Sequence, residues 1–555
     1  MSKQMANALT CSNLRIVSRS TGVPLVDDVS LSVERGEFVG LVGESGSGKS
    51  TICFALLGLI RKGTQVTHGQ VRIGGIDPLS LPSHDLLKVR RSEIAYVPQS
   101  AGYALNPALT ISRQLQDRLP GAVDAHDRIS HAFNRVSLPA TKDFLERYPH
   151  QLSGGQQQRV AIASALVTNP KVIVFDEPTT GLDVAVQAQI LDMIRRLCAD
   201  EHVASLFISH DLAAVASLCS RTIVMRQGRV VEAGETRQVL RTPNEEYTKT
   251  LVRSMPSLSA SLAIIGPRGK GYDRPSAIGN ASALSVDGLS AYYGSKRVLH
   301  GLNLSIKPGE CTALVGESGS GKTTLCRALI GLHSNYEGAI SLDGGLLQKS
   351  SLQRSFDNRR RMQYVFQNPY DSLNPRRTVR DIILEPIRFL GQKRSGNFAS
   401  EQLKRVRLPT SFVDRYPHQL SGGERQRVAL ARSLAANPRF LICDEVTSAL
   451  DVSVQASVLD LIMDIRREMG LTVLFVTHHI GLVPAISDNV IVLKDGRAVD
   501  FGPTADVLIN PRSEYTRSLL ELTLDPGRTQ ETPSATASAL GPDDHAGLAV
   551  QREHI

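Results

Sequence analysis

The sequence predicts an α/β protein made of two tandem, homologous domains. The motif GESGSGK(S/T) occurs at 43–50 and again at 316–323, and YPHQLSGG occurs at 148–155 and at 416–423. Motifs that recur in the same order at nearly constant spacing identify an internal duplication. Short apolar runs, such as 38–42, precede the glycine-rich motifs, and longer segments with helical periodicity follow them. This alternation is typical of buried parallel strands connected by helices.

The repeat also predicts where the domains begin and end. We expect the first domain at 8–253 and the second at 284–523. The segment between them, 254–283, is rich in Ser, Gly and Pro and is predicted to be a linker. Residues 524–555 have the composition of a disordered tail. Buried strands are predicted at 38–42, 172–175 and 440–443, and helices at 51–59 and 184–197.

Composition excludes several classes of protein. The 555 residues are 41% hydrophobic and 21% charged, which is ordinary for a globular protein and not for a disordered chain. No apolar stretch is long enough to span a membrane, and the first residues lack the apolar region of a secretory signal. Seven scattered cysteines without CxxC spacing predict reduced thiols in a cytoplasmic protein.

Charge does not point to nucleic acid. The formal net charge is +9, but Lys and Arg are dispersed, and the longest basic cluster is 359–361. There is no Trp, and aromatic residues make up only 5% of the chain, so stacking platforms for bases are poorly supplied. We therefore expect a mildly basic surface and no nucleic-acid partner.

The two glycine-rich motifs have the GxxxxGK(S/T) pattern of a phosphate-binding loop. Glycines let backbone N–H groups approach phosphate oxygens at a helix start. We expect Lys49 and Lys322 to reach the β- and γ-phosphates, and the hydroxyls of Ser50 and Thr323 to coordinate Mg²⁺. A glycine-rich turn without a ligand is the alternative, and two copies that each follow a strand argue against it. The predicted nucleotide-binding residues here are Gly43, Glu44, Ser45, Gly46, Ser47, Gly48, Lys49, Ser50 and Thr51, and Gly316, Glu317, Ser318, Gly319, Ser320, Gly321, Lys322, Thr323 and Thr324.

Each domain also has an apolar strand that ends in two acids. These pairs are Asp176 with Glu177, and Asp444 with Glu445. We expect the two aspartates to hold Mg²⁺ through its water shell, and the two glutamates to polarise the water that attacks the γ-phosphate. Ordinary surface carboxylates would not explain why the same pair closes an apolar strand twice.

The third motif is LSGGQ at 152–156 and LSGGE at 420–424. A phosphate loop, an LSGG motif and a strand ending in Asp-Glu, in this order, resemble the ATP-binding-cassette ATPases over both domains. The resemblance implies two cassettes, each an α/β ATPase domain with a helical subdomain that carries LSGG. It also implies that the cassettes pair head to tail, so that each ATP lies between the phosphate loop of one cassette and the LSGG of the other.

The resemblance implies two composite ATP sites. The first would combine Lys49, Ser50, Gln99, Asp176, Glu177 and His210 with Ser421, Gly422, Gly423 and Glu424. The second would combine Lys322, Thr323, Gln367, Asp444, Glu445 and His478 with Ser153, Gly154, Gly155 and Gln156. In the family, the glutamine of the Q-loop contacts the metal and the switch histidine contacts the γ-phosphate. Asp183 and Asp451 match the D-loop of the family.

Both copies keep the catalytic glutamate, the metal ligands and the switch histidine, so two hydrolytically competent sites are predicted. This argues against an inert scaffold. The sites differ in one respect. Tyr293 matches the aromatic on which the family stacks adenine, whereas the corresponding stretch 16–24 of the first copy holds no aromatic residue. Glu424 replaces the Gln of the other LSGG motif, which is a common variation.

Two further segments resemble the peptide/nickel (oligopeptide/dipeptide) importer branch. The sequence LNP follows each Q-loop, at 105–107 and 373–375, and PxxEYT follows each cassette, at 243–248 and 511–516. Turn and helix-start chemistry alone is the alternative. The branch implies two separate permease subunits, a solute-binding protein and a peripheral location on the cytoplasmic face of the inner membrane. The solute stays open: peptides lead, and nickel chelates, glutathione and opine-like or sugar-like compounds remain candidates.

Two features separate this interpretation from its alternatives. Some family members carry a cysteine cluster for an iron–sulfur centre after a cassette, but here no Cys lies between Cys219 and Cys311 or after Cys443, so none is expected. A soluble twin-cassette ATPase that acts on ribosomes or DNA is the competing class. Such factors typically have a long charged linker or zinc-binding cysteines, whereas this linker is short and poor in charge.

Overall fold

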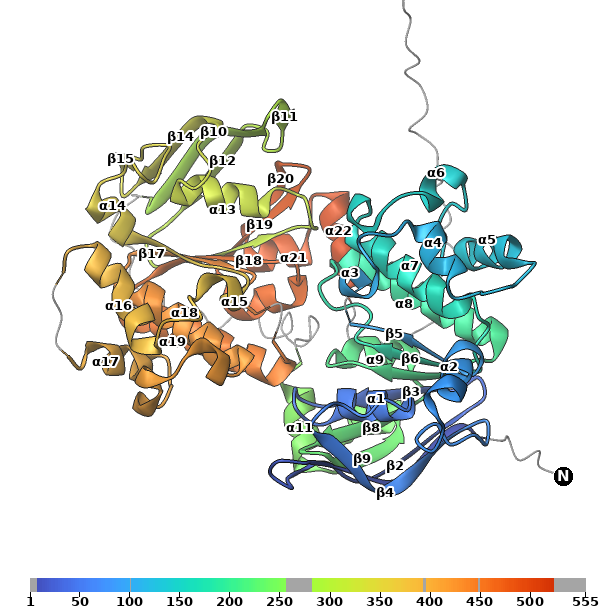
Figure 1. Cartoon of the computed structure of the whole chain (residues 1–555). Helices are drawn as coiled ribbons and strands as arrows, with labels where there is room; N and C mark the ends of the chain where they lie inside the picture. Colours follow the sequence, from blue (N-terminus) through green and yellow to red (C-terminus); the bar gives the residue numbers. More distant parts are fainter. Residues whose placement is uncertain (1–6, 100, 256–281, 393–395, 448–449, 524–555) are drawn as a thin grey trace, which may run out of the picture.

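The computed structural model describes residues 7–99, 101–255, 282–392, 396–447 and 450–523. Most of the predicted linker and the whole predicted tail lie outside these described residues. The described part forms two cassettes of the same architecture, which lie side by side (Figure 1). Within this part, no helix is both long and apolar enough to cross a membrane. All seven cysteines are buried free thiols.

Each cassette is built on a six-stranded sheet and a smaller antiparallel sheet. In the first cassette the strand orders are β5-β6-β7-β3-β8-β9 and β2-β1-β4, and in the second they are β16-β17-β18-β13-β19-β20 and a sheet around β10 and β14. The last strand of each large sheet is antiparallel and the other five are parallel. The identical order confirms the α/β fold and the duplication.

The strands of the first cassette are β1 (Asn7–Ser18), β2 (Pro24–Glu34), β3 (Phe38–Val42), β4 (Thr64–Ile73), β5 (Ile94–Val97), β6 (Val172–Asp176), β7 (Ala204–Ile208), β8 (Arg221–Arg226) and β9 (Arg229–Glu235). Its helices are α1 (Lys49–Leu56), α2 (Ser83–Ser92), α3 (Ala101–Ala104), α4 (Ile111–Gln116), α5 (Ala125–Arg135), α6 (Lys142–Leu145), η1 (Pro149–Gln151), α7 (Gly154–Leu166), α8 (Val184–Glu201), α9 (Leu212–Leu218), α10 (Thr236–Arg241) and α11 (Glu246–Arg253).

The strands of the second cassette are β10 (Leu284–Tyr293), β11 (Lys296–Arg297), β12 (Leu302–Ile306), β13 (Cys311–Val315), β14 (Tyr336–Leu342), β15 (Gly345–Leu346), β16 (Met362–Val365), β17 (Phe440–Asp444), β18 (Thr472–Thr477), β19 (Asn489–Lys494) and β20 (Arg497–Pro503). Its helices are α13 (Lys322–Ile330), α14 (Phe356–Arg361), α15 (Pro369–Ser372), α16 (Val379–Phe389), α17 (Phe398–Arg405), η2 (Thr410–Asp414), η3 (Pro417–Gln419), α18 (Gly422–Ala435), α19 (Val452–Met469), η4 (Ile480–Leu482), α20 (Val483–Ile486), α21 (Thr504–Ile509) and α22 (Glu514–Leu522).

The central strands form where the sequence predicts buried apolar runs. All five residues of β3, β6 and β17 are buried, as expected for parallel strands covered on both faces. The first predicted helix has different limits. It runs from Lys49 to Leu56 rather than over 51–59, because Gly58 adopts a φ of 66° and turns the chain away. A side chain at Gly58 would lie 2.6 Å from the Pro78 carbonyl oxygen.

The order of the parallel strands gathers the predicted motifs at one edge of each sheet. β3 leads into the phosphate loop, and its neighbour β7 ends two residues before His210. The next strands, β6 and β5, end at the Asp176–Glu177 pair and just before Gln99. Carboxyl ends of parallel strands meet at the same edge, and ligands bind there in open α/β sheets.

Candidate functional site: two ATPase centres

Each phosphate loop connects a buried strand directly to a helix. Gly48 and Gly321 stand at the N-caps of α1 and α13 with φ of 101° and 104°, a left-handed conformation that favours glycine. A Cβ at Gly48 would lie 2.8 Å from the Leu25 carbonyl oxygen, so the close approach of the chain also requires glycine. The helix N-terminus behind the loop favours a bound phosphate.

The phosphate-loop lysines are buried and face the loop. Lys49 Nζ donates to the carbonyl oxygens of Gly43 at 2.6 Å and Glu44 at 2.8 Å. Lys322 Nζ makes the same two bonds, to Gly316 at 2.7 Å and Glu317 at 2.8 Å. Burial lowers the pKa of both lysines, while nearby carboxylates oppose that shift. The amine is thereby held where the predicted phosphates would bind.

Asp176 and Asp444 close the strands β6 and β17, and each accepts a hydrogen bond from a buried or partly buried tyrosine. Tyr96 Oη donates to Asp176 Oδ2 at 3.0 Å, and Tyr364 Oη donates to Asp444 Oδ2. Burial raises the pKa of both aspartates, against the effect of the tyrosine hydroxyls. These tyrosines were not predicted from the sequence, although each stands three residues before the Q-loop glutamine of its cassette.

Glu177 and Glu445 lie at the centre of a polar triad in each cassette. Gln99 Nε2 donates to Glu177 at 2.8 Å, and Gln367 Nε2 donates to Glu445 at 2.7 Å. His210 Nδ1 lies 3.2 Å from a Glu177 oxygen, and His478 Nδ1 lies 3.4 Å from a Glu445 oxygen. The two glutamates have φ of 49° and 47°, in the left-handed region that few non-glycine residues adopt.

The charges of the first triad are coupled. Burial on its own raises the pKa of Glu177, but the hydrogen bond and charge of His210, together with the Thr180 hydroxyl and the charge of Lys49, outweigh it, so the pKa of Glu177 is lowered. Burial lowers the pKa of His210, but the bond to Glu177 and the charges of nearby carboxylates outweigh that effect, so the pKa of His210 is raised. The pair is therefore most stable between the two pKa values. It is lost on the acidic side when Glu177 is protonated, and on the basic side when His210 is deprotonated.

This coupling predicts a shift in the pH dependence of hydrolysis. In His210→Gln the pKa of Glu177 rises, because its largest stabilising partner is gone. We expect the acidic limb of the ATPase pH profile to move toward neutral pH for the activity contributed by the first site. Steady-state ATPase rates from pH 5 to 9 measure this limb. His68→Gln, an exposed change on β4, is the matched control, and a limb that stays in place would contradict the pairing.

Both LSGG motifs start a helix through the same reciprocal cap. Ser153 Oγ accepts from the Gln156 N–H at 3.3 Å, and Gln156 Oε1 accepts from the Ser153 N–H at 3.0 Å. Ser421 and Glu424 form the same pair at 3.3 and 2.7 Å. Gln and Glu both supply the acceptor oxygen of a capping box, which explains why Glu424 can replace Gln.

The glycines of LSGG allow two helices to approach each other. A Cβ at Gly155 would lie 2.7 Å from a Val186 methyl, and one at Gly423 would lie 2.5 Å from a Val454 methyl. Val186 and Val454 belong to α8 and α19, the helices whose N-caps are Asp183 and Asp451. Each LSGG is therefore packed against the D-loop helix of its own cassette.

The cavity at the second phosphate loop is lined by both cassettes. A cavity of about 790 Å³ is lined by Lys322, Thr323, Gln367, Glu445 and His478 of the second cassette, and by Thr180, Gly181 and Leu182 of the first. The charge of Asp183 acts on Lys322, and the charge of Asp451 acts on Lys49 and His210. Residues 180–182, which precede Asp183, thus lie beside the second phosphate loop. Residues 153–156 are not among the described residues that line this cavity.

Tyr293, the predicted adenine-stacking residue, lies at the end of β10. Its side chain is 47% exposed, and its ring centroid is 4.7 Å from that of His333. The corresponding end of β1 carries Ser18. An aromatic face is therefore presented at this strand end in the second cassette and not at the same position in the first.

Comparisons with known proteins agree with this geometry. The family profile described as ABC transporter matches residues 26–180 and 299–448. The chain belongs to the ABC transporter ATP-binding family. Its two cassettes are ATPase domains. The profile described as the C-terminal region of oligopeptide/dipeptide transporters matches residues 231–277. The structure shows that the second cassette ends in the same way, because β20, α21 and α22 repeat β9, α10 and α11.

Individual relatives cover almost the whole chain. The glutathione import ATP-binding protein GsiA of Salmonella choleraesuis is 36% identical over 98% of this chain and 97% of its own. The peptidoglycan transport ATP-binding protein YejF of Agrobacterium fabrum is 38% identical over 89% and 92%. The archaeal ribosome recycling factor aABCE1, solved with a ribosomal stalk protein, shares the fold, with a TM-score of 0.61 at 24% identity over 88% and 90%. The ATP-binding proteins of importers are therefore the relatives of this chain, and the likeness to the ribosome factor is one of fold.

Proposed function

We propose that this chain is the ATP-hydrolysing subunit of an importer for peptides or related small solutes. The observation that carries the proposal is the pair of equivalent Gln–Glu–His triads, one in each cassette, beside a phosphate loop. The transporter-type extension at 231–277 and relatives named for glutathione and peptidoglycan transport support the solute class. We place the subunit at the cytoplasmic face of the inner membrane, bound to two permease subunits that work with a solute-binding protein.

The triads explain how each site would hydrolyse ATP. Glu177 and Glu445 act as general bases that take a proton from the attacking water, and their depressed pKa keeps them ionised at neutral pH. His210 and His478 orient these carboxylates and reach toward the γ-phosphate. Lys49 and Lys322 bind the β- and γ-phosphates and neutralise charge that develops in the transition state.

The oxygen-rich set of side chains fits Mg²⁺. Ser50, Gln99 and Asp176 would hold it in the first site, and Thr323, Gln367 and Asp444 in the second. The amide nitrogens of Gln99 and Gln367 are bonded to the glutamates, so their oxygens are the atoms available as ligands. Bound Mg²⁺ supplies charge neutralisation for the β- and γ-phosphate oxygens.

We further propose that the cassettes close on ATP as head-to-tail partners. The D-loop of the first cassette already lines the second site, and the charges of Asp183 and Asp451 reach across to the opposite lysines. Closure would bring 153–156 to the second phosphate loop and 421–424 to the first. The helix starts at Ser153 and Ser421 then present their N–H groups to the γ-phosphates.

The two cassettes offer different surfaces for the two permeases. Phe356 on α14 and Phe389 at the end of α16 are 59% and 62% exposed, with ring centroids 6.0 Å apart. The Arg359 guanidinium lies over both rings, at 5.1 and 5.7 Å from the centroids. The equivalent positions of the first cassette hold Lys88 and Gly121. We propose that this aromatic surface binds a cytoplasmic permease segment with apolar and acidic side chains.

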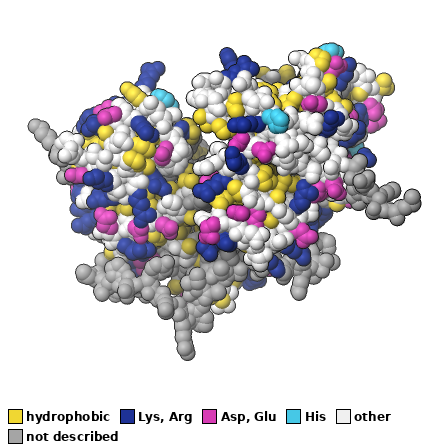
Figure 2. Space-filling view, turned by 90° about the horizontal axis from the view of Figure 1, so that it is seen from below, with side chains coloured by type: hydrophobic (Ala, Val, Ile, Leu, Met, Phe, Trp, Pro, Cys, Tyr) yellow, Lys and Arg dark blue, Asp and Glu magenta, His cyan; other side chains and the backbone are white. Residues whose placement is uncertain are grey.

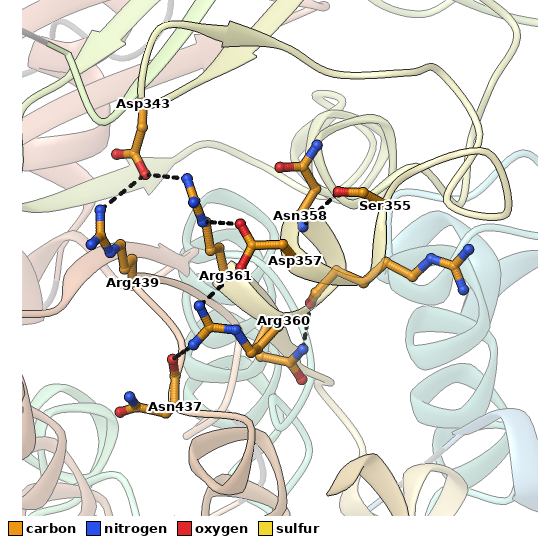
Figure 3. A network of polar contacts seen from close by, with 10 residues as sticks. Asp343, Ser355, Asp357, Asn358, Arg360, Arg361, Asn437 and Arg439 are labelled. Carbon is orange, nitrogen blue, oxygen red and sulfur yellow. Dashed lines mark hydrogen bonds and ion pairs between the residues drawn. The ribbon is translucent and has the colours of Figure 1, made fainter. Parts of the chain in front are cut away.

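A polar network ties this surface to the second catalytic site. Asp357 pairs with Arg360 and Arg361, and Arg361 and Arg439 share Asp343 (Figure 3). Arg439 directly precedes β17, which ends at Asp444. α14 leads directly into β16, the strand before Gln367. A permease that moves α14 would therefore move β16 and β17, the strands that precede Gln367 and Glu445.

The same network explains the longest basic cluster of the sequence. Arg360 and Arg361 are paired with carboxylates, and Arg359 donates to the Arg354 and Leu352 carbonyls and covers the two Phe rings. On the face seen in Figure 2, Lys and Arg side chains are scattered among Asp and Glu. Neither arrangement forms a basic groove for nucleic acid.

The experiment that tests the function is a tagged pull-down from detergent-solubilised cells, with co-purifying proteins identified by mass spectrometry. We expect two polytopic permeases. Ribosomal or DNA-repair proteins without a permease would instead establish the soluble twin-cassette factor. The variant Phe356→Ser with Phe389→Ser should lose one permease and keep the other, because only the second cassette carries the aromatic surface. Leu352→Ser, at an exposed position before α14, is the matched control for loss of an exposed apolar side chain.

A further inference from the structure

The extensions after the two cassettes contain a duplicated PxxEYT segment whose tyrosine reaches the phosphate loop. Tyr247 Oη accepts a hydrogen bond from the Glu44 N–H at 3.2 Å, and Tyr515 Oη accepts one from the Glu317 N–H at 3.1 Å. These partners are 203 and 198 residues apart in the sequence. Glu44 and Glu317 are the second residues of their phosphate-loop motifs.

The peptide unit that donates this bond is also the one held by the phosphate-loop lysine. The Glu44 N–H and the Gly43 C=O belong to one planar peptide unit. Lys49 Nζ donates to the Gly43 oxygen at 2.6 Å, so the lysine and Tyr247 hold opposite sides of the same unit. In the second cassette, Lys322 and Tyr515 hold the unit between Gly316 and Glu317 in the same way.

This peptide unit also has little room to move toward the large sheet of its cassette. A Cβ at Gly43 would lie 2.3 Å from the Met225 carbonyl oxygen, and one at Gly316 would lie 2.2 Å from the Leu493 carbonyl oxygen. Met225 and Leu493 are on β8 and β19. The first turn of the phosphate loop is thus packed against the sheet. The tyrosine hydroxyl holds the N–H side of the same peptide unit.

Each extension is built to hold its tyrosine in place. Glu232 on β9 accepts from the Asn244 and Glu245 N–H groups at 2.9 and 3.2 Å, which anchors the start of α11. Asp500 on β20 anchors α22 by accepting from the Ser513 N–H at 3.0 Å and the Thr516 hydroxyl at 2.5 Å.

The tyrosine rings are held from the sheet side as well. The Arg226 guanidinium and the Lys494 ammonium each lie 4.8 Å from the centroid of the nearby tyrosine ring, that of Tyr247 and Tyr515 respectively. Burial raises the pKa of Tyr247 and raises that of Tyr515 to about 12. Both hydroxyls are therefore neutral at physiological pH and act as uncharged acceptors.

We propose that Tyr247 and Tyr515 are positioning residues of the two phosphate loops, through which the transporter-type extension sets the affinity of each cassette for ATP. This rests on the proposed function of the sites as ATPase centres. The tyrosine keeps the first peptide of the loop oriented when the lysine exchanges its carbonyl partners for phosphate oxygens. Without the hydroxyl, that peptide can rotate and the loop loses part of its preorganisation for phosphate.

The test is Tyr247→Phe, Tyr515→Phe and their combination in the full chain. Each removes one oxygen and keeps the ring. One hydrogen bond is worth about 1 kcal/mol, so we expect the Kd and the KM for Mg-ATP to rise roughly fivefold at the affected site. The kcat at saturating ATP should change less than about twofold, because the triads are intact. The thermal midpoint without nucleotide should change little, which separates positioning from a general loss of stability.

Tyr292→Phe is the matched control. Its hydroxyl donates to Glu337 on an exposed part of the antiparallel sheet, and its neighbour Tyr293 points to the other face of the strand. We expect its Kd for Mg-ATP to equal that of the wild type. A wild-type Kd in the double Phe variant would overturn the proposal. Because the test measures nucleotide binding, its result is valid whether or not the chain drives import.

Discussion

The double variant Glu177→Gln with Glu445→Gln is expected to bind ATP and to lose nearly all steady-state hydrolysis. Glutamine has the same shape as glutamate but cannot take a proton from water. A general base contributes about 10²- to 10⁴-fold to the rate of such a reaction, and we expect a loss of that order. Retained ATP after gel filtration, together with a phosphate-release assay, measures both parts of this result.

The control for this variant is Glu146→Gln with Glu401→Gln, two exposed glutamates away from the triads. Its ATPase rate should equal that of the wild type. Undiminished hydrolysis in Glu177→Gln with Glu445→Gln would remove the general-base assignment. Each single variant is informative as well. If both triads hydrolyse ATP, neither single change leaves the rate untouched.

Replacing either phosphate-loop lysine is expected to weaken ATP binding at its own site. Lys49→Ala or Lys322→Ala removes a buried ammonium that would bind the β- and γ-phosphates. Charge-assisted hydrogen bonds contribute about 1.5–3 kcal/mol, so the Kd for Mg-ATP at that site should rise about 10- to 100-fold. Titration with a fluorescent ATP analogue measures the two sites in each variant.

A transport assay tests whether both ATP sites are needed for solute uptake. Uptake of solute by vesicles that contain the whole transporter should fall in Lys49→Ala and also in Lys322→Ala. If one of the two variants transported at the wild-type rate, the prediction of two competent sites would be wrong. Lys62→Ala, an exposed lysine after α1, is the matched control for the loss of a positive charge.

The sequence predicted the local parts of both sites. A strand, a glycine-rich loop and a helix start lie within about fifteen residues, so backbone conformation and spacing are enough to identify the phosphate loops. The same holds for the acids that end β6 and β17, whereas the capping boxes at the start of each LSGG helix came from the structure. The limits of the helix after the first phosphate loop were wrong, because the turn at Gly58 depends on packing against Pro78 and Leu86.

The family resemblance already grouped Gln99, Glu177 and His210 in one site, but only the tertiary structure decided which of the distant side chains contact one another. Strand order places Gln99, Glu177 and His210 at one edge of the sheet, and it places Tyr96 on Asp176 over 80 residues of sequence. The bond between Tyr247 and the first phosphate loop, and the D-loop that lines the opposite site, need the packing of whole segments and of the two cassettes. The physical reason is the separation along the sequence of the residues that interact. Local conformation follows from neighbouring residues, whereas these contacts depend on how sheets and helices pack after the chain has folded.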